Sequence, residues 1–317
     1  MESTVHEVAE RIWSCEQPDG PRRIRQVVIA GGASALVVDT GLPDSPAAGL
    51  LDLLERLGLE VGILLTHPDA DHVGGTAAIL ERYPDAALMA GTADIDLTGD
   101  PERAIDERYA AFVDDGIPFS DAEAERARAR FGPAFGSVEA VHDGETLDLG
   151  GRHVELLWTP GHSPGHTVAW VPDALTMAAA DAVMGEAIPD VDGNPFVPPM
   201  YAPPGDYRVT IAQLEGLPIE CLLTGHEPVL DAEGAQELLQ ASRAACARMS
   251  ALVREALLDA PATLTTVGER VQVAHGNLPA DRLAALAMTV DGHLGELESA
   301  GGVVVEPGPP RTFRRSA

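Results

Sequence analysis

Residues that can bind a metal ion directly follow several apolar segments of this chain. The segment 66–75 reads THPDADHVGG and comes immediately after the apolar segment 61–65. Three further candidates each follow an apolar or β-branched segment of their own: His162, Asp181 and His226. Imidazole and carboxylate are the ligands that divalent first-row metals prefer. We therefore expect a sheet scaffold that presents a metal site where its strands end.

The first 90 residues alternate between strand-like and helix-like patterns. Segments 25–29 and 35–38 flank Gly31-Gly32, which predicts a hairpin. Ser45-Pro46 and the leucines that follow at helical spacing predict a helix that ends at Gly58. Further strands are expected at 61–66 and 86–90, with a helix at 75–83 between them. This alternation predicts an α/β (α+β) fold in which helices cover a sheet.

Residues 91–137 interrupt the alternation with charged, alanine-rich segments, which predict a helical insertion with helices at 101–115 and 121–130. Strand patterns return at 146–149, 154–159, 168–171, 175–180 and 222–224. Residues 184–205 form a proline-rich loop of a length that is usually functional or mobile. From residue 230 onward the pattern predicts helices at 230–259, 264–273 and 283–297, and then a hairpin of 303–306 with 311–314. We therefore divide the chain into a catalytic domain, 1–229, and a C-terminal winged-helix-like helical domain, 230–317.

The charge of the chain excludes several classes of function. All 21 basic residues are arginine, so neither a Schiff-base lysine nor a P-loop lysine is available. The net charge of −29 disfavours nucleic acid and anionic membranes as partners. Residues 230–317 hold 11 acidic and 8 basic residues, a net charge of −3, whereas a DNA-binding domain needs a basic face. We expect a small-molecule substrate, no nucleic-acid partner and no membrane partner, and a homodimer is compatible with the sequence.

The cysteines and the N-terminus indicate a cytoplasmic protein. Cys15, Cys221 and Cys246 have neither disulfide nor zinc-finger spacing. Residues 1–10 contain no basic patch and no apolar run, unlike a secretory signal. No apolar stretch approaches the roughly 18 residues of a membrane span.

The order of these motifs resembles that of the metallo-β-lactamase superfamily, particularly its glyoxalase II-like hydrolases, over about residues 10–230. The resemblance rests on Asp39-Thr40-Gly41, the 67–72 cluster, Gly161-His162, Asp181 and Gly225-His226. It implies an αββα sandwich, two packed mixed sheets flanked by helices, with two divalent metal ions at one edge.

The resemblance also implies a role for each ligand. The first metal ion would be bound by His67, Asp69 and His162. The second would be bound by Asp71, His72 and His226, and Asp181 would bridge both. A hydroxide that bridges the ions would be the nucleophile, and Asp71 would be the catalytic residue that orients it or carries a proton. The expected reaction is hydrolysis of an ester, thioester or lactone of a small molecule.

One position departs from the usual family motif, His-x-His-x-Asp-His. The second histidine of that motif is Asp69 here. A harder ligand set favours iron or manganese relative to zinc. Zinc remains the expected metal, but an iron-dependent (di-iron or mono-iron) oxygen-utilising enzyme on the same fold stays open as an alternative. A first metal site that is weakened or left empty by Asp69 also stays open.

Weaker expectations concern residues near the predicted site. Asp39 is expected to support the metal loop through hydrogen bonds, and His166 to be a structural neighbour of the ligands. The remaining histidines are expected at the surface or in packing: His142, His153, His275 and His293. Tyr201 and Phe196 are predicted to bind substrate, together with Tyr207 and Met200, although a purely structural loop is the alternative. The insertion is a candidate lid, from which Arg103 or Arg108 would meet an anionic substrate.

Overall fold

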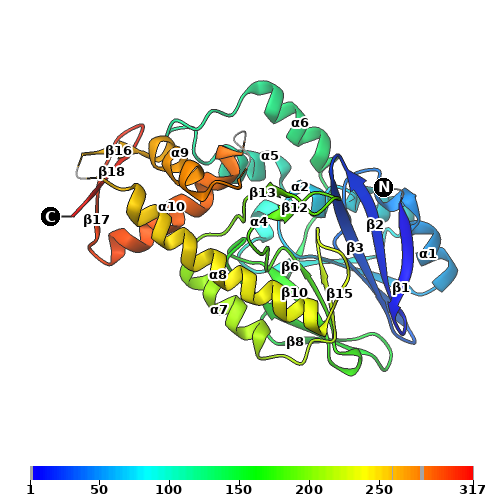
Figure 1. Ribbon diagram of the computed structural model, residues 1–317. Coiled ribbons are helices and arrows are strands. Elements are labelled where there is room, and N and C mark those ends of the chain that lie inside the picture. The colour runs from blue at the N-terminus through cyan, green and yellow to red at the C-terminus, as the bar shows by residue number, and fades with distance from the viewer. Residues whose placement is uncertain (1–2, 259, 279–281, 317) are drawn as a thin grey trace.

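The computed structural model describes residues 3–258, 260–278 and 282–316, and two sheets packed face to face form its centre (Figure 1). The first sheet has seven strands in the order of the chain: β1 (Thr4–Ala9), β2 (Ile12–Asp19), β3 (Arg22–Ala30), β4 (Ser34–Val38), β5 (Glu60–Leu65), β6 (Ala87–Gly91) and β7 (Glu139–Val141). Strands β1 to β4 pair antiparallel, and β4 to β7 pair parallel. The sheet is therefore mixed.

The second sheet has six strands in the order β15-β14-β11-β10-β9-β8. Their bounds are β8 (Glu145–Asp148), β9 (His153–Trp158), β10 (Thr167–Val171), β11 (Thr176–Ala180), β14 (Cys221–Thr224) and β15 (Leu230–Asp231). Strands β11 and β14 pair parallel, and the other pairs are antiparallel. Strands β9, β11 and β14 therefore point in one direction, so the residues that follow them reach the same edge of the sheet.

The apolar segments of the central strands are continuous because both of their faces are buried. In β4, Ala35 and Val37 pack toward the helices on the outer face, whereas Leu36 and Val38 pack toward the second sheet. Side chains of a strand alternate between its two faces, so a strand covered on both sides needs apolar residues at every position. Such a strand has the same sequence pattern as a buried helical turn, and only its short length distinguishes it.

Helices cover the outer face of each sheet, which confirms the predicted αββα sandwich. The first sheet is covered by η1 (Pro46–Ala48), α1 (Leu50–Leu57), α2 (Ala70–Val73) and α3 (Thr76–Arg82). The second sheet is covered by α7 (Pro204–Glu215) and the first half of α8 (Ala232–Ala256). Helix α1 ends as predicted, because Gly58 adopts the left-handed conformation with φ 62°. Short elements complete this part: η3 (Pro172–Ala174), β12 (Ile188–Pro189) and β13 (Pro195–Val197).

The predicted insertion lies between the neighbouring strands β6 and β7 and contains α4 (Ile95–Thr98), α5 (Pro101–Ala104), η2 (Ile105–Tyr109) and α6 (Asp121–Phe131). A capping box between Ser120 and Glu123 fixes the start of α6. The predicted continuous helix at 101–115 is wrong, because its regular part ends at Tyr109. Residues 110–120 are turns and loop that lead toward the C-terminal elements.

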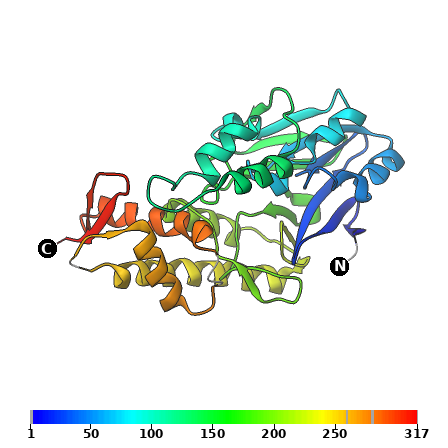
Figure 2. The same cartoon turned by 90° about the horizontal axis from the view of Figure 1, so that it is seen from above.

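The C-terminal elements are α8, α9 (Leu264–His275), α10 (Leu283–Ser299) and a sheet in the order β16 (Ala262–Thr263), β18 (Thr312–Arg315), β17 (Val303–Glu306). Apart from the first half of α8, they lie at the opposite end of the molecule from the N-terminus (Figure 2). Helix α8 belongs to both parts, since Leu239 packs under the second sheet and Val253 packs in the C-terminal cluster.

The division at residue 229 and the winged-helix likeness stay predictions. Strands β1 and β2 were not predicted. None of the helices in the described residues has both the length and the apolar character needed to cross a membrane.

Candidate metal centre

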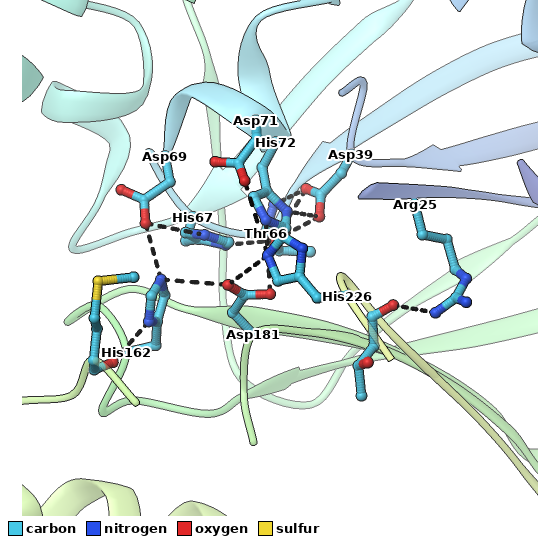
Figure 3. Close-up of polar contacts among 12 residues, drawn as sticks. Arg25, Asp39, Thr66, His67, Asp69, Asp71, His72, His162, Asp181 and His226 are labelled. Atoms are coloured by element: carbon cyan, nitrogen blue, oxygen red, sulfur yellow. Dashed lines mark hydrogen bonds and ion pairs between the residues drawn. The ribbon is translucent and has the colours of Figure 1, made fainter. Parts of the chain in front are cut away.

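The seven predicted ligands come together at one edge of the sandwich (Figure 3). His67, Asp69, Asp71 and His72 follow β5 of the first sheet, and Asp71 and His72 lie on the single turn of α2. The second sheet contributes His162 after β9, Asp181 after β11 and His226 after β14. All seven side chains are nearly inaccessible to solvent. The shared edge exists because these strands end on the same side of the two packed sheets.

Candidate ligand atoms lie within 4.8 Å of one another in three groups. Two of them contain predicted ligands alone: His67, His162 and Asp181, and Asp71, His72 and His226; the third joins His67 and His72 to Asp39. In the first group, Asp69 Oδ2 lies 3.0 Å from His162 Nε2 and 3.5 Å from His67 Nε2. Asp181 lies between the groups, with Oδ2 3.3 Å from His226 Nε2 and 4.0 Å from His162 Nε2.

Each imidazole is oriented by an oxygen atom at its Nδ1. The partners of Nδ1 are Thr66 Oγ1 at 2.9 Å for His67, Asp39 Oδ2 at 2.7 Å for His72, the Met200 carbonyl at 2.8 Å for His162 and the Arg23 carbonyl at 2.8 Å for His226. A proton on Nδ1 leaves the lone pair on Nε2, which is the atom that faces the centre. Oxygen partners of this kind fix the tautomer and the ring orientation of metal-binding histidines.

The ligand atoms fit a divalent cation. His67 Nε2 and His72 Nε2 are buried and make no hydrogen bond within the described part of the chain. A buried polar atom without a partner is costly and calls for an explanation, such as an ion. A pair of ions held there would bind both nitrogen atoms and neutralise the negative charge of the converging carboxylates.

The pKa values reflect the opposite charges that lie side by side at the centre. Burial by itself raises the pKa of Asp69, but Arg108 outweighs it and holds that pKa well below its usual range. Burial likewise opposes ionisation of Asp181, whose pKa is lowered well below its usual range by His226 and His72. Burial lowers the pKa of His72, yet Asp39 and Asp181 raise it to about 10. The position of His72 therefore favours positive charge.

Gly225 is required by the close approach of two ligands. A Cβ atom at this position would lie 2.5 Å from Asp181 Oδ1 and 2.9 Å from Cε1 of His72. Real Cβ atoms do not approach side-chain atoms this closely, so any other residue would displace a ligand. The Gly225-His226 pair in the sequence is thus a packing requirement of the centre.

Comparison with known proteins agrees with this geometry. The family model described as "Metallo-beta-lactamase superfamily" matches residues 19–226. The chain belongs to the metallo-β-lactamase superfamily. It is 28% identical over 215 residues to the probable metallo-hydrolase YflN of Bacillus subtilis (strain 168). The aligned residues make up 61% of this chain and 75% of that protein. It is 29% identical over 152 residues to a hydroxyacylglutathione hydrolase of Synechococcus sp. (strain JA-3-3Ab), which covers 48% of this chain and only 44% of that enzyme.

Solved structures with the superfamily fold align along nearly the whole chain. A metallo-beta-lactamase family protein from Thermus thermophilus superposes with a TM-score of 0.72 at 25% identity and covers 98% of this chain and 100% of that one. A beta-lactamase domain protein from Burkholderia ambifaria superposes with a TM-score of 0.76 at 18% identity, covering 98% and 93%, and shows the fold alone. The C-terminal helical elements are thus present in other chains with this fold.

Three guanidinium groups lie beside the candidate metal centre. Two of them, those of Arg22 and Arg130, were not expected there from the sequence. Arg22 Nη2 lies 2.8 Å from Asp71 Oδ2, and Arg108 contacts both oxygens of Asp69. Arg130 pairs with Asp19 through two contacts of 2.8 and 2.9 Å. Arg108 was predicted to meet an anionic substrate, whereas its observed partners are Asp69 and His162. Arg103, the other candidate, is exposed and pairs with Asp96 and Glu107.

A cavity of about 560 Å³ opens onto the outer ligands of the centre. Asp69, Asp71 and the three arginines line its polar side. Its apolar side comes from the insertion, the proline-rich loop and α10, and includes Phe112, Phe119, Phe196, Met200 and Met288. The cavity is therefore large enough for a small molecule that is partly apolar.

Only part of the predicted substrate-binding set lines this cavity. Phe196 and Met200 do. The prediction for Tyr201 is wrong, because its ring is fully buried, stacks on Tyr207 at 4.1 Å and places its hydroxyl 3.2 Å from His293 Nε2. An aromatic residue beside a loop has the same sequence pattern whether it faces a cavity or the core. Tyr207 is likewise buried in the core under the second sheet.

The predicted supporting residues lie next to the ligands. Asp39 accepts hydrogen bonds from the backbone N–H and hydroxyl of Thr66 and binds Nδ1 of His72, as expected. His166 is buried and stacks on His67 with 5.1 Å between ring centroids. His142 and His153 are exposed, whereas His275 and His293 are buried in packing.

Proposed function

We propose that this chain is a metal-dependent hydrolase that cleaves an ester, thioester or lactone of a small molecule. The observation that carries the proposal is the convergence of four oriented imidazoles and three carboxylates, two of which, Asp69 and Asp71, line a cavity. The relatives named as hydrolases, among them a hydroxyacylglutathione hydrolase, support the same reaction class. The more specific assignment, that the cleaved bond is an ester, thioester or lactone, is part of the proposal.

Two groups of ligands would hold divalent ions, zinc in our proposal. His67, Asp69 and His162 would hold one, Asp71, His72 and His226 the other, and Asp181 would lie between them. Ions bound there would lower the pKa of a bound water toward about 7 and polarise the carbonyl of the substrate.

Asp71 is proposed as the catalytic residue because of its environment. Burial opposes its ionisation, but Arg22 and the neighbouring histidines hold the pKa of Asp71 well below its usual range. An ionised carboxylate that lines the cavity can accept a hydrogen bond from the attacking water and so orient it. Phe196 and Met200 would pack against the apolar part of the substrate.

Substitution of Asp71 and His162 tests this proposal. Asp71→Asn and His162→Ala are expected to lose at least about 100-fold in kcat/KM against a panel of small esters, thioesters and lactones, since even supporting residues of metal ligands cost about 10- to 100-fold. His142→Ala is the matched control, because this histidine is exposed and lies outside the ligand groups. Circular dichroism checks that each variant folds. Full activity in Asp71→Asn would remove the assignment.

An iron-dependent, oxygen-utilising enzyme is the second candidate, and Asp69 is the observation that favours it. A carboxylate in place of an imidazole makes the ligand set harder, which favours iron. Elemental analysis and an oxygen electrode separate the two candidates: zinc without oxygen consumption supports the hydrolase. We also propose a cytoplasmic location, which the free thiols of Cys15, Cys221 and Cys246 support.

A further inference from the structure

The candidate ligands form two halves: His67, Asp69 and His162 in one, and Asp71, His72 and His226 in the other. The guanidinium of Arg108 lies against the first half. Its Nη2 lies 2.9 Å from Asp69 Oδ2 and 3.0 Å from His162 Nε2, and its Nε donates to Asp69 Oδ1. Its Nη1 also donates to the His162 carbonyl at 3.2 Å. Because His162 Nδ1 faces the Met200 carbonyl at 2.8 Å, Nε2 is the nitrogen that accepts from Arg108. The arginine therefore uses both oxygens of Asp69 and the lone pair with which His162 would bind a metal ion.

This position of Arg108 is fixed by the fold of the insertion. Its side chain is only 9% exposed. The next residue, Tyr109, accepts a hydrogen bond from the backbone N–H of Ala70 at 3.1 Å, which ties η2 to the turn that carries Asp71 and His72. The ring of Tyr109 also packs edge-on against Phe131 of α6. Arg108 is thus held in one position beside the ligands, unlike an exposed arginine that samples many rotamers.

In the other group, Asp71, His72 and His226, no guanidinium among the described residues contacts an imidazole, whereas Arg108 contacts His162 Nε2 but leaves His67 Nε2 without a hydrogen-bond partner. Arg22 contacts Asp71 through a single oxygen, Oδ2, at 2.8 Å. His72 Nε2 has no hydrogen-bond partner among the described residues. His226 Nε2 lies 3.3 Å from Asp181 Oδ2 and 3.8 Å from Asp71 Oδ2. Two imidazole Nε2 atoms therefore face carboxylates there, and a divalent ion between them would bind both kinds of ligand.

The charges at the centre balance one divalent ion better than two. The carboxylates that are candidate ligands or contact one are Asp39, Asp69, Asp71 and Asp181, and the guanidiniums bonded to them are Arg22 and Arg108. Imidazoles that bind a metal ion are neutral, so four negative and two positive charges leave −2 for the ions to balance. Asp19 and Arg130 pair and cancel each other. A second divalent ion would lie beside the positive charge of Arg108, and like charges a few ångströms apart at a buried site repel strongly.

We propose that Arg108 makes the two halves of the centre unequal. One divalent ion binds tightly at Asp71, His72 and His226, and the guanidinium supplies the positive charge in the other half. A second ion binds there only when Arg108 leaves Asp69 and His162. The inference rests on the proposed function for the existence of a metal centre, but it concerns the number and affinity of the ions and does not depend on the reaction.

The same pairing accounts for Asp69 at the position of the usual histidine. A carboxylate accepts two parallel N–H bonds from a guanidinium, which an imidazole cannot do. Asp69 and Arg108 are therefore a matched pair, and substitution of either one is expected to change the affinity of this half for metal.

Metal titration of the full chain tests the proposal. The chelator-treated protein is titrated with Zn²⁺ and separately with Mn²⁺ in a calorimeter, and bound metal is counted by elemental analysis after dialysis. The wild-type chain is expected to bind one ion tightly and a second at least about tenfold more weakly. Arg108→Met is expected to tighten the second ion by at least about tenfold. Arg103→Met, an exposed arginine of the same insertion, is expected to behave as the wild type.

Two further variants keep the test decisive. Arg108→Lys keeps the charge but not the forked contact, so its second affinity is expected to fall between those of the wild type and Arg108→Met. Asp69→His with Arg108→Met removes the buried pair as a unit and is expected to bind two ions with similar affinity. Equal affinities for two ions in the wild type, or no change in Arg108→Met, would overturn the proposal. No binding in the wild type and in Arg103→Met would instead overturn the metal centre itself.

Discussion

Asp39 contacts both ends of the loop that carries the candidate ligands. Its carboxylate accepts hydrogen bonds from the backbone N–H of Thr66 at 2.8 Å and from the hydroxyl of Thr66, and it lies 2.7 Å from His72 Nδ1. Thr66 in turn lies 2.9 Å from His67 Nδ1. One buried side chain therefore contacts His72 of α2 directly and His67 through Thr66. Its backbone has a positive φ of 60°, which is uncommon for a residue other than glycine.

Asp39→Asn is expected to weaken metal binding without unfolding the chain. The amide keeps a single acceptor oxygen and brings an N–H₂ group toward either Thr66 or His72, so one imidazole loses its orientation. We expect the affinity for the tighter ion to fall about 10- to 100-fold. Calorimetric titration measures the change, and Asp52→Asn, on the exposed side of α1, is the control. Unchanged affinity in Asp39→Asn would show that the orientation of His72 does not depend on this carboxylate.

At the scale of elements, the insertion connects the metal centre to the C-terminal helices. Its Arg108 contacts Asp69, and Ile117 packs in the C-terminal cluster. Between them, Asp115 accepts from the backbone N–H of Arg311 and from its guanidinium, and the Asp115 carbonyl accepts from Thr265. The C-terminal elements therefore support the cavity partly through the insertion, in addition to the residues of α10 that line it.

The Asp115–Arg311 pair is expected to make stability depend on pH. The hydrogen bonds of Arg311, opposed by partial burial, lower the pKa of Asp115. A lowered pKa in the folded state means that the contribution is fully present above about pH 4, the ordinary value for aspartate, and is lost as the pH falls through the folded-state pKa. Asp115→Asn is therefore expected to be less stable than the wild type at pH 7, on the order of 1 kcal/mol.

Thermal melts between pH 7 and pH 3 check this expectation. The difference in Tm between the wild type and Asp115→Asn should stay constant down to about pH 5 and shrink below about pH 4. Asp114→Asn, an exposed neighbour, should follow the wild type throughout. A difference that grew toward acid pH would contradict the assigned role of Asp115.

At the scale of the whole molecule, the candidate metal centre lies where the two sheets meet. The loop after β5 of the first sheet supplies four of the candidate ligands, and the loops after β9, β11 and β14 of the second supply three. The sheets otherwise meet through an apolar interface that includes Leu36, Val38, Leu156 and Ala169. An ion bound to both sheets stabilises their contact, because a ligand that binds only the folded state shifts unfolding toward higher temperature.

Removal of metal is accordingly expected to lower Tm. A free ion concentration of about 100 times Kd adds about 2.7 kcal/mol to the free energy of unfolding. Differential scanning calorimetry with excess chelator, and then with added Zn²⁺, should show a lower and a restored Tm. Asp71→Asn should show a smaller difference between the two conditions. Identical melting of the wild type in both conditions would contradict a centre that spans the sheets.

The sequence by itself determined that helices cover a sheet, the helical character of the insertion and the seven candidate ligands, whereas the two-sheet sandwich was expected only from the resemblance to the superfamily. Apolar segments of strand length are readable from residue periodicity, and ligand types placed directly after such segments reach the edge of a sheet. The same local reasoning could not show strands β1 and β2, whose pattern mixes charged and apolar residues. It also could not separate Phe196, which lines the cavity, from Tyr201, which lies in the core.

Only the tertiary structure decided which charges meet. Arg22, Arg108 and Arg130 come from β3, η2 and α6, and nothing in their sequence surroundings distinguishes them from the exposed arginines of the chain. Arg108 reaches Asp69 across 39 positions because η2 docks on α2. Pairing of this kind depends on distances between distant segments, which periodicity does not encode, and here it sets the electrostatics of the metal centre.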